Sequence, residues 1–280
     1  MIATVVQMAP VLGDRPGNLA RVVEHIRAAA EAGSRLVIFP ECALSGYGFE
    51  SLADALAAAE AVPGESSDVL ARTAARTGCA VVCGLLECEG GRLYNTAVVI
   101  GPEGLVGRHR KAHVVRVAAD AFVTLGDRLE VFEVAGARVG VLICYEVRFP
   151  EAARAMALRG ANVLALPTNW PRGAEVNPTI MVPARAAENN LYVLAANRTG
   201  SEGSLSYIGQ SVIQGPDGSV LARAGSEEAV LQAEIRPETA GLRAVDVAPS
   251  KYAVNLRGDR RPDLYGPLVV TDEASVDLKP

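Results

Sequence analysis

Three residues whose side chains could act together in acyl transfer each follow an apolar segment typical of a buried strand. Cys144 follows RVGVLI (138–143), and Glu41 follows RLVIFP (35–40). Lys111 follows the second strand of an expected hairpin. A thiol nucleophile needs a base to accept its proton, and the oxyanion formed in acyl transfer needs positive charge nearby. Cysteine, glutamate and lysine can supply these functions.

The position of these residues in the chain favours a shared site. Open α/β sheets place their reactive groups beyond the carboxyl ends of strands, so three such groups can meet at one edge. Each residue alone has a plainer explanation, because a cysteine after an apolar strand is often a small buried hydrophobe. A glutamate or lysine there is often a solvated loop charge. His25, His109 and His113 occupy no comparable position, so a cysteine–histidine pair is less favoured.

Strand and helix patterns alternate along the chain, which predicts an α/β fold with a mixed sheet. We expect strands at 2–8, 35–40, 79–87, 138–143, 161–169 and 191–197, and helices at 18–32, 50–60, 66–76, 150–159 and 183–190. No low-complexity linker interrupts the pattern. We therefore predict one domain over residues 1–280, with a C-terminal extension from about 239 that packs on the body or on a partner subunit.

Composition narrows the class of protein. Half of the 280 residues are hydrophobic and 21% are charged, so the chain can form a sizeable core. The net charge of −5 argues against a nucleic-acid partner, which would need clustered lysine and arginine. No apolar run is long enough for a membrane span, and the first residues lack a signal-peptide pattern. With five cysteines, an odd number, a reduced cytoplasmic location is expected.

Three ordered segments resemble the signature blocks of one enzyme family. FPECALSGY (39–47), HRKAHV (109–114) and CYEVRFPE (144–151) are similar to those of the nitrilase superfamily of carbon–nitrogen hydrolases. Supporting matches include LPTNWP (166–171) and DRRPDLY (259–265). The resemblance covers nearly the whole chain. It implies a four-layer α-β-β-α sandwich, no metal or organic cofactor, and assembly as a homodimer or larger homo-oligomer.

The resemblance also implies roles for the three residues singled out above. Glu41 matches the general base and Cys144 the nucleophile, while Lys111 matches the residue that stabilises the tetrahedral intermediate. The backbone N–H of Tyr145 would complete the oxyanion site. Attack on an amide carbon would release ammonia or an amine and leave a thioester, which water activated by the glutamate would hydrolyse. The alternative from another class is a non-catalytic binding or regulatory protein on the same fold.

One segment departs from the family pattern. Many members carry a second glutamate between the lysine and cysteine blocks, shortly before a Pro-Gly. This chain has VVRVAADAFVTLGD there, with no glutamate and with Leu125-Gly126 in place of Pro-Gly. Asp120 is the nearest carboxylate to the matching position. Either Asp120 replaces the glutamate with a shorter side chain, or the substrate is positioned differently.

The residues beside the cysteine give an expectation for the substrate. Tyr145-Glu146 resembles the amidase and omega-amidase-like branches, whereas true nitrilases tend to have Trp then Glu. A small-molecule amide is therefore expected, with nitriles and N-carbamoyl compounds as alternatives. Arg148 or Arg172 could bind a substrate carboxylate, although a structural role is also open for Arg148. Trp170 could line the pocket or simply pack in the core.

Overall fold

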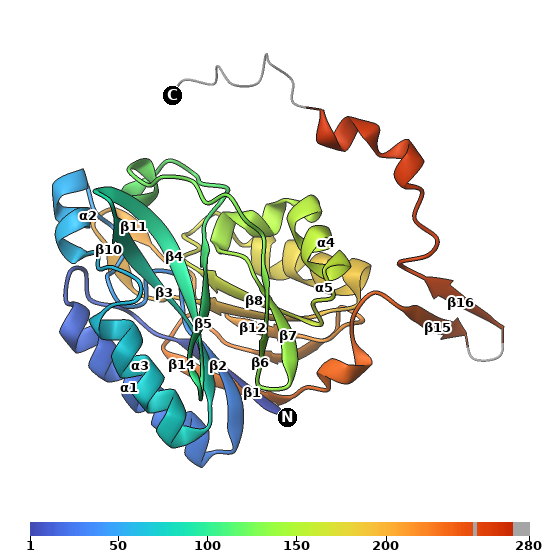
Figure 1. Ribbon diagram of the computed structural model, residues 1–280, viewed down its shortest axis with the longest axis horizontal. Helices are drawn as coiled ribbons and strands as arrows, with labels where there is room; N and C mark the ends of the chain where they lie inside the picture. The colour runs from blue at the N-terminus through green and yellow to red at the C-terminus, as the bar shows by residue number, and fades with distance from the viewer. Residues whose placement is uncertain (249–250, 271–280) are drawn as a thin grey trace. The chain divides into compact units, whose positions relative to one another are not determined.

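The structure is a computed structural model that describes residues 1–248 and 251–270 (Figure 1). The chain divides into two compact units, Met1–Leu242 and Arg243–Pro280. The division falls close to residue 239, where we expected the extension to begin. Whether that extension packs on the body or on a partner remains a prediction.

The first unit contains two six-stranded sheets. The first sheet has the order β14 (Ala229–Glu234), β1 (Ile2–Gln7), β2 (Ser34–Ile38), β3 (Ala80–Glu89), β4 (Arg92–Gly101) and β5 (Gly104–Arg110). The second has the order β13 (Val220–Arg223), β12 (Val212–Gln214), β9 (Tyr192–Asn197), β8 (Val163–Thr168), β7 (Ala137–Val141) and β6 (Val131–Val134). In each sheet three central strands are parallel and the flanking strands are antiparallel.

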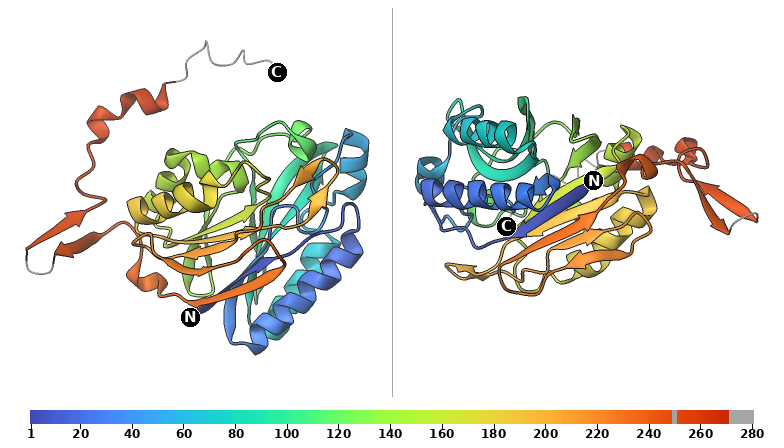
Figure 2. Two further views of the ribbon diagram at one scale, coloured as in Figure 1. Left: turned by 180° about the vertical axis from the view of Figure 1, so that it is seen from behind. Right: turned by 90° about the horizontal axis from the view of Figure 1, so that it is seen from below.

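The two sheets pack face to face, with helices on their outer sides (Figures 1 and 2). The pair α1 (Arg15–Glu31) and α3 (Glu65–Thr77) covers the first sheet, and the pair α4 (Pro150–Leu158) and α5 (Val182–Asn189) covers the second. The predicted α-β-β-α sandwich is confirmed. Shorter elements of this unit are α2 (Leu52–Ala58), η1 (Ala118–Ala121), η2 (Cys144–Arg148), η3 (Asn177–Met181), η4 (Pro237–Thr239), β10 (Ser201–Glu202) and β11 (Leu205–Ser206).

Strand alternation explains the continuous apolar runs in the sequence. In β2, Leu36 and Ile38 belong to the core between the two sheets, together with Val139 and Val163 of the second sheet. Val37 points the other way, into the core under α1 and α3. Because successive side chains of a strand point to opposite faces, a strand covered on both sides is apolar at every position.

The second unit contains a hairpin of β15 (Ala244–Ala248) and β16 (Tyr252–Asn255), followed by η5 (Pro262–Leu264) and η6 (Gly266–Val269). The sequence shows little periodicity in this region, where we expected an extension. The hairpin is a separate two-stranded sheet, so its strands need not carry the continuous apolar runs of strands that are covered on both faces.

Candidate active site

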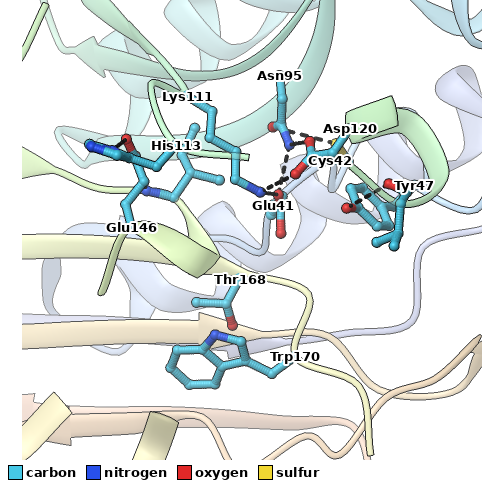
Figure 3. Close-up of polar contacts among 12 residues, drawn as sticks. Glu41, Cys42, Tyr47, Asn95, Lys111, His113, Asp120, Glu146, Thr168 and Trp170 are labelled. Carbon is cyan, nitrogen blue, oxygen red and sulfur yellow. Dashed lines mark hydrogen bonds and ion pairs between the residues drawn. The ribbon is translucent and has the colours of Figure 1, made fainter. Parts of the chain in front are cut away.

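The centre of the candidate site is the ammonium group of Lys111, the residue after β5. Its Nζ donates to Glu41 Oε1 at 2.7 Å and to Asp120 Oδ2 at 2.5 Å (Figure 3). All three side chains are at most 1% exposed. Buried charges are tolerated when they are paired and hydrogen-bonded, and here one cation lies between two carboxylates. The structure therefore brings three of the predicted site residues together.

Burial and charge shift the pKa values of this group. Burial raises the pKa of Glu41, and the negative charge of Asp120 adds to that effect while Lys111 opposes it. For Lys111, burial alone would lower the pKa, but the two carboxylates outweigh it and the pKa is raised. Lys111 is therefore a permanent cation, and Glu41 is a stronger base than an exposed glutamate.

Glu41 is positioned by the close approach of its loop to β3. Gly84 donates its backbone N–H to the carbonyl of Pro40 at 3.2 Å, and its own carbonyl accepts from Leu44. A Cβ at Gly84 would lie 2.5 Å from the backbone nitrogen of Cys42. Glycine is thus required for the loop to lie against the strand. Only one oxygen of Glu41 is engaged, because Oε2 has no hydrogen-bond partner among the described residues.

Asn95 of β4 joins the two carboxylates and was not identified from the sequence. Its Nδ2 donates to Glu41 Oε1 at 2.7 Å and to Asp120 Oδ1 at 2.8 Å. Its backbone carbonyl accepts from the backbone N–H of Lys111 at 2.8 Å. The only sequence signal is an asparagine inside an otherwise apolar strand, YNTAVVIG. A buried polar side chain in such a strand needs partners, which is a reason to look for a polar site there.

Asp120 reaches the lysine because a short 3₁₀ turn, η1, is attached to the loop after Glu41. The backbone N–H of Ala119 donates to the carbonyl of Tyr47 at 3.0 Å. The hydroxyl of Tyr47 donates to the carbonyl of Val117 at 3.1 Å. These contacts on both sides bring the turn close enough for an aspartate to contact the ammonium. A longer glutamate side chain is not needed at this position.

Cys144 lies at the start of η2, three residues beyond the end of β7. Its φ of +52° is left-handed, a conformation that residues other than glycine adopt at a cost of about 1–3 kcal/mol. Burial raises the pKa of its thiol, and the charge of Glu41 adds to this. Lys111 and a hydrogen bond from the backbone of Asn169 act in the opposite direction. Because the net pKa shift is upward, the resting side chain is a thiol.

Glu146 connects the cysteine turn with the lysine loop. Its Oε2 accepts from the backbone N–H of Ile143 at 2.8 Å and lies 2.7 Å from Nε2 of His109. Its Oε1 accepts from the backbone N–H of Ala112 at 3.0 Å and lies 3.2 Å from Nδ1 of His113. Burial opposes ionisation of Glu146, but the histidines and hydrogen bonds outweigh it and hold its pKa far below the usual range.

The remaining predicted residues lie around this centre. The ring of Tyr145 packs edge-on against Phe149, with centroids 5.1 Å apart. Trp170 is 1% exposed and belongs to the core between the sheets, with no hydrogen-bond partner for its indole nitrogen among the described residues. Arg148 is exposed and donates to Oδ1 of Asn177 at 3.1 Å, and Arg172 is also exposed.

The described residues contain neither a metal-binding cluster nor a membrane-spanning helix. Within residues 1–248 and 251–270, no group of three or more histidine, cysteine, aspartate or glutamate side chains is arranged to bind a metal ion. None of the helices in the same ranges has the length and apolar character needed to cross a membrane.

Comparison with known proteins assigns the family. The family model for carbon-nitrogen hydrolases matches residues 2–244. The chain belongs to this family. Within it, a nitrilase of Pyrococcus abyssi is 39% identical over 82% of this chain and 87% of that protein. Omega-amidase NIT2-A of Xenopus laevis is 36% identical over 92% and 93% of the two chains.

Solved structures of carbon-nitrogen hydrolases have the same fold. An amidase from Nesterenkonia sp. AN1, described with acrylamide added at its active-site cysteine, superposes with a TM-score of 0.79. It is 27% identical, and the match covers 96% of this chain and 100% of that one. Nit3 of Saccharomyces cerevisiae, a member of the nitrilase superfamily, gives a TM-score of 0.75 at 25% identity, over 85% and 91% of the chains.

Proposed function

We propose that this protein is an amidase that hydrolyses a small, non-peptide carboxamide through a thioester at Cys144. The observation that carries the proposal is the buried lysine. Lys111 is fixed between Glu41 and Asp120, and all three interact electrostatically with the thiol of Cys144. A base, a fixed cation and a thiol in one buried site are the groups that acyl transfer requires.

In the acylation step, Cys144 Sγ attacks the carbonyl carbon and its proton passes to Glu41. Oε2 is the free oxygen of that carboxylate, since Oε1 already accepts from Lys111 and Asn95. Lys111 and the backbone N–H of Tyr145 stabilise the oxyanion. When the C–N bond breaks, Glu41 returns the proton to the leaving nitrogen, and ammonia departs from the thioester.

In the deacylation step, Glu41 takes a proton from water, and the hydroxide attacks the thioester carbon. The C–S bond breaks, the carboxylic acid leaves, and the proton returns to Cys144. Asp120 takes no part in proton transfer. Its role is to hold Lys111 in place, because Oδ2 of Asp120 accepts a second hydrogen bond from the ammonium that also donates to Glu41.

The names of the relatives support an amide substrate and keep a second candidate. The Xenopus protein is an omega-amidase and the Nesterenkonia protein is an amidase. The Pyrococcus relative is a nitrilase, so hydrolysis of a nitrile is the second candidate. A nitrile would first add the Cys144 thiol to give a thioimidate, and one water must add before ammonia leaves and the thioester forms. A covalent adduct that still holds the substrate nitrogen therefore distinguishes a nitrile from an amide.

The test combines ammonia release with intact-protein mass spectrometry. Aliphatic amides, omega-amides, N-carbamoyl amino acids and nitriles are screened, and an acyl-enzyme mass is sought for each. Cys144→Ala should abolish both signals. The control, Cys88→Ala, changes a half-buried cysteine at the far end of β3 and should leave both intact. Persistent ammonia release by Cys144→Ala would refute the mechanism, and no acyl-enzyme with any substrate would favour the binding-protein alternative.

A further inference from the structure

Asn169 follows β8 and lies beside the nucleophile. Strands β7 and β8 are parallel neighbours, with Val141 opposite Ala165. The turn η2, which begins at Cys144, contacts β8, the strand that ends immediately before Asn169. The backbone of Asn169 also forms a hydrogen bond with the thiol of Cys144. The backbone of Asn169 therefore lies at the reacting sulfur.

The side chain of Asn169 is buried without a partner. It is 3% exposed, and neither Oδ1 nor Nδ2 has a hydrogen-bond partner among the described residues. Buried polar side chains are normally satisfied, so an unpaired donor and acceptor in one side chain indicate a ligand site.

In contrast, the side-chain hydroxyl of Thr168 and the backbone N–H of Trp170 are both paired. Thr168 Oγ1 donates to Oδ1 of Asn197 at 2.8 Å, and the backbone N–H of Trp170 donates to the same oxygen at 2.7 Å. Asn197 donates in turn to the carbonyl of Gly209 at 2.6 Å. The backbone on either side of Asn169 is thus fixed, while its own side chain is left available.

The unpaired groups of Asn169 and Glu41 match a primary carboxamide. Asn169 offers one acceptor and one donor, and Oε2 of Glu41 offers a second acceptor. A primary carboxamide has two N–H donors and one carbonyl acceptor. An ester or nitrile has no donor and would leave both acceptors unpaired.

Resting on the proposed amidase function, we infer that Asn169 binds the carboxamide of the substrate and selects primary amides over esters and nitriles of the same acyl group. Its Oδ1 accepts from the leaving –NH₂, and its Nδ2 donates to the carbonyl oxygen. An amide and its matching methyl ester form the same thioester at Cys144, releasing ammonia or methanol. The effect of Asn169 can therefore differ between the two substrates only in the acylation step.

The experiment measures the rate of thioester formation by mass spectrometry for an amide and its methyl ester. Asn169→Leu removes the donor and acceptor at nearly constant size. We expect its amide rate to fall about 5- to 150-fold, the effect of leaving a buried hydrogen-bonding group unpaired. The ester rate should fall less, because an ester shares the carbonyl contact with Nδ2 but has no –NH₂ to bind Oδ1. Asn169→Asp keeps an acceptor for –NH₂, so its amide-to-ester ratio should stay nearer to that of the wild type, and it carries the test if Asn169→Leu does not fold.

The matched control is Thr168→Val, which changes the neighbouring residue and breaks its hydrogen bond with Asn197. It should alter both rates equally. If Asn169→Leu leaves the amide-to-ester ratio of rates unchanged, the inference is overturned, because a structural role affects both substrates alike. Failure of the proposed function is distinct, since the wild type itself would then form no thioester from any amide.

Discussion

Replacing Asp120 by asparagine tests whether this aspartate serves as the site's second carboxylate. Asp120 accepts hydrogen bonds on both oxygens, from Lys111 at 2.5 Å and from Asn95 at 2.8 Å. Asparagine has the same shape but only one oxygen. If that oxygen faces the lysine, its –NH₂ faces the –NH₂ of Asn95, and the reverse orientation directs –NH₂ at the ammonium. Either orientation brings two hydrogen-bond donors face to face.

The magnitude follows from these contacts. Hydrogen bonds with a charged partner contribute about 1.5–3 kcal/mol, roughly twice those between neutral groups. Asp120→Asn leaves Lys111 with at best a neutral acceptor. About 1–2 kcal/mol of the hydrogen-bond energy that holds the ammonium in place is therefore lost. The corresponding decrease in kcat/KM is about 5- to 30-fold.

The pH profile gives a second, independent readout. The negative charge of Asp120 contributes to the raised pKa of Glu41. Removing that charge lowers the pKa, so Glu41 remains an ionised base at lower pH. The acid limb of kcat/KM against pH should therefore move to lower pH in Asp120→Asn. A purely structural defect would lower activity without moving this limb.

The assay is ammonia release from the best amide across pH, with circular dichroism to verify folding. The control is Asp127→Asn, the same substitution at an aspartate in the same segment whose side chain is 85% exposed. It should leave rate and pH profile unchanged. Wild-type kinetics and an unshifted acid limb in folded Asp120→Asn would refute the reasoning and show that the substrate is positioned without this carboxylate.

Two further predictions concern the cation and the connection between the loops. Lys111→Ala should lower turnover about a hundredfold or more, as expected for loss of an oxyanion donor, while the exposed Lys251→Ala should not; near-normal turnover in Lys111→Ala would count against its role. Glu146→Gln should lower the free energy of unfolding at neutral pH by about 1–3 kcal/mol, measured by urea denaturation. Because the folded-state pKa of Glu146 is depressed, its contribution is present above the ordinary glutamate pKa and lost as pH falls below it. The wild type should lose stability over that acid range more steeply than the variant, and parallel curves would contradict the assignment.

Strand-end residues could be predicted from the sequence because a local pattern reveals them. Apolar runs end just before Glu41 and Cys144, and both runs are strands with extended backbone beyond them. Asp120 could be proposed because it is the nearest carboxylate to an expected position. Each of these predictions depended on a short stretch of chain or on the resemblance to a family.

Residues that act through distant partners could not be predicted in this way. Asn95 contacts Glu41 and Asp120, which are 54 and 25 positions away in the chain. Glu146 contacts Ala112, 34 positions away. Nothing local to an asparagine in a strand, or to a glutamate after a cysteine, specifies such partners. They become evident only when the sheets bring the lysine loop and the cysteine turn together.

The charges of the assembled site determine when the nucleophile forms. Glu41, Lys111 and Asp120 carry a net negative charge when ionised, and burial keeps the pKa of Cys144 high. A resting thiolate would add a second uncompensated negative charge to a dry site, which is costly. In the proposed mechanism the proton therefore leaves Cys144 as the carbon–sulfur bond forms, when the new negative charge develops on the substrate oxygen beside Lys111. The proposed mechanism thus couples deprotonation of Cys144 to its attack on the substrate.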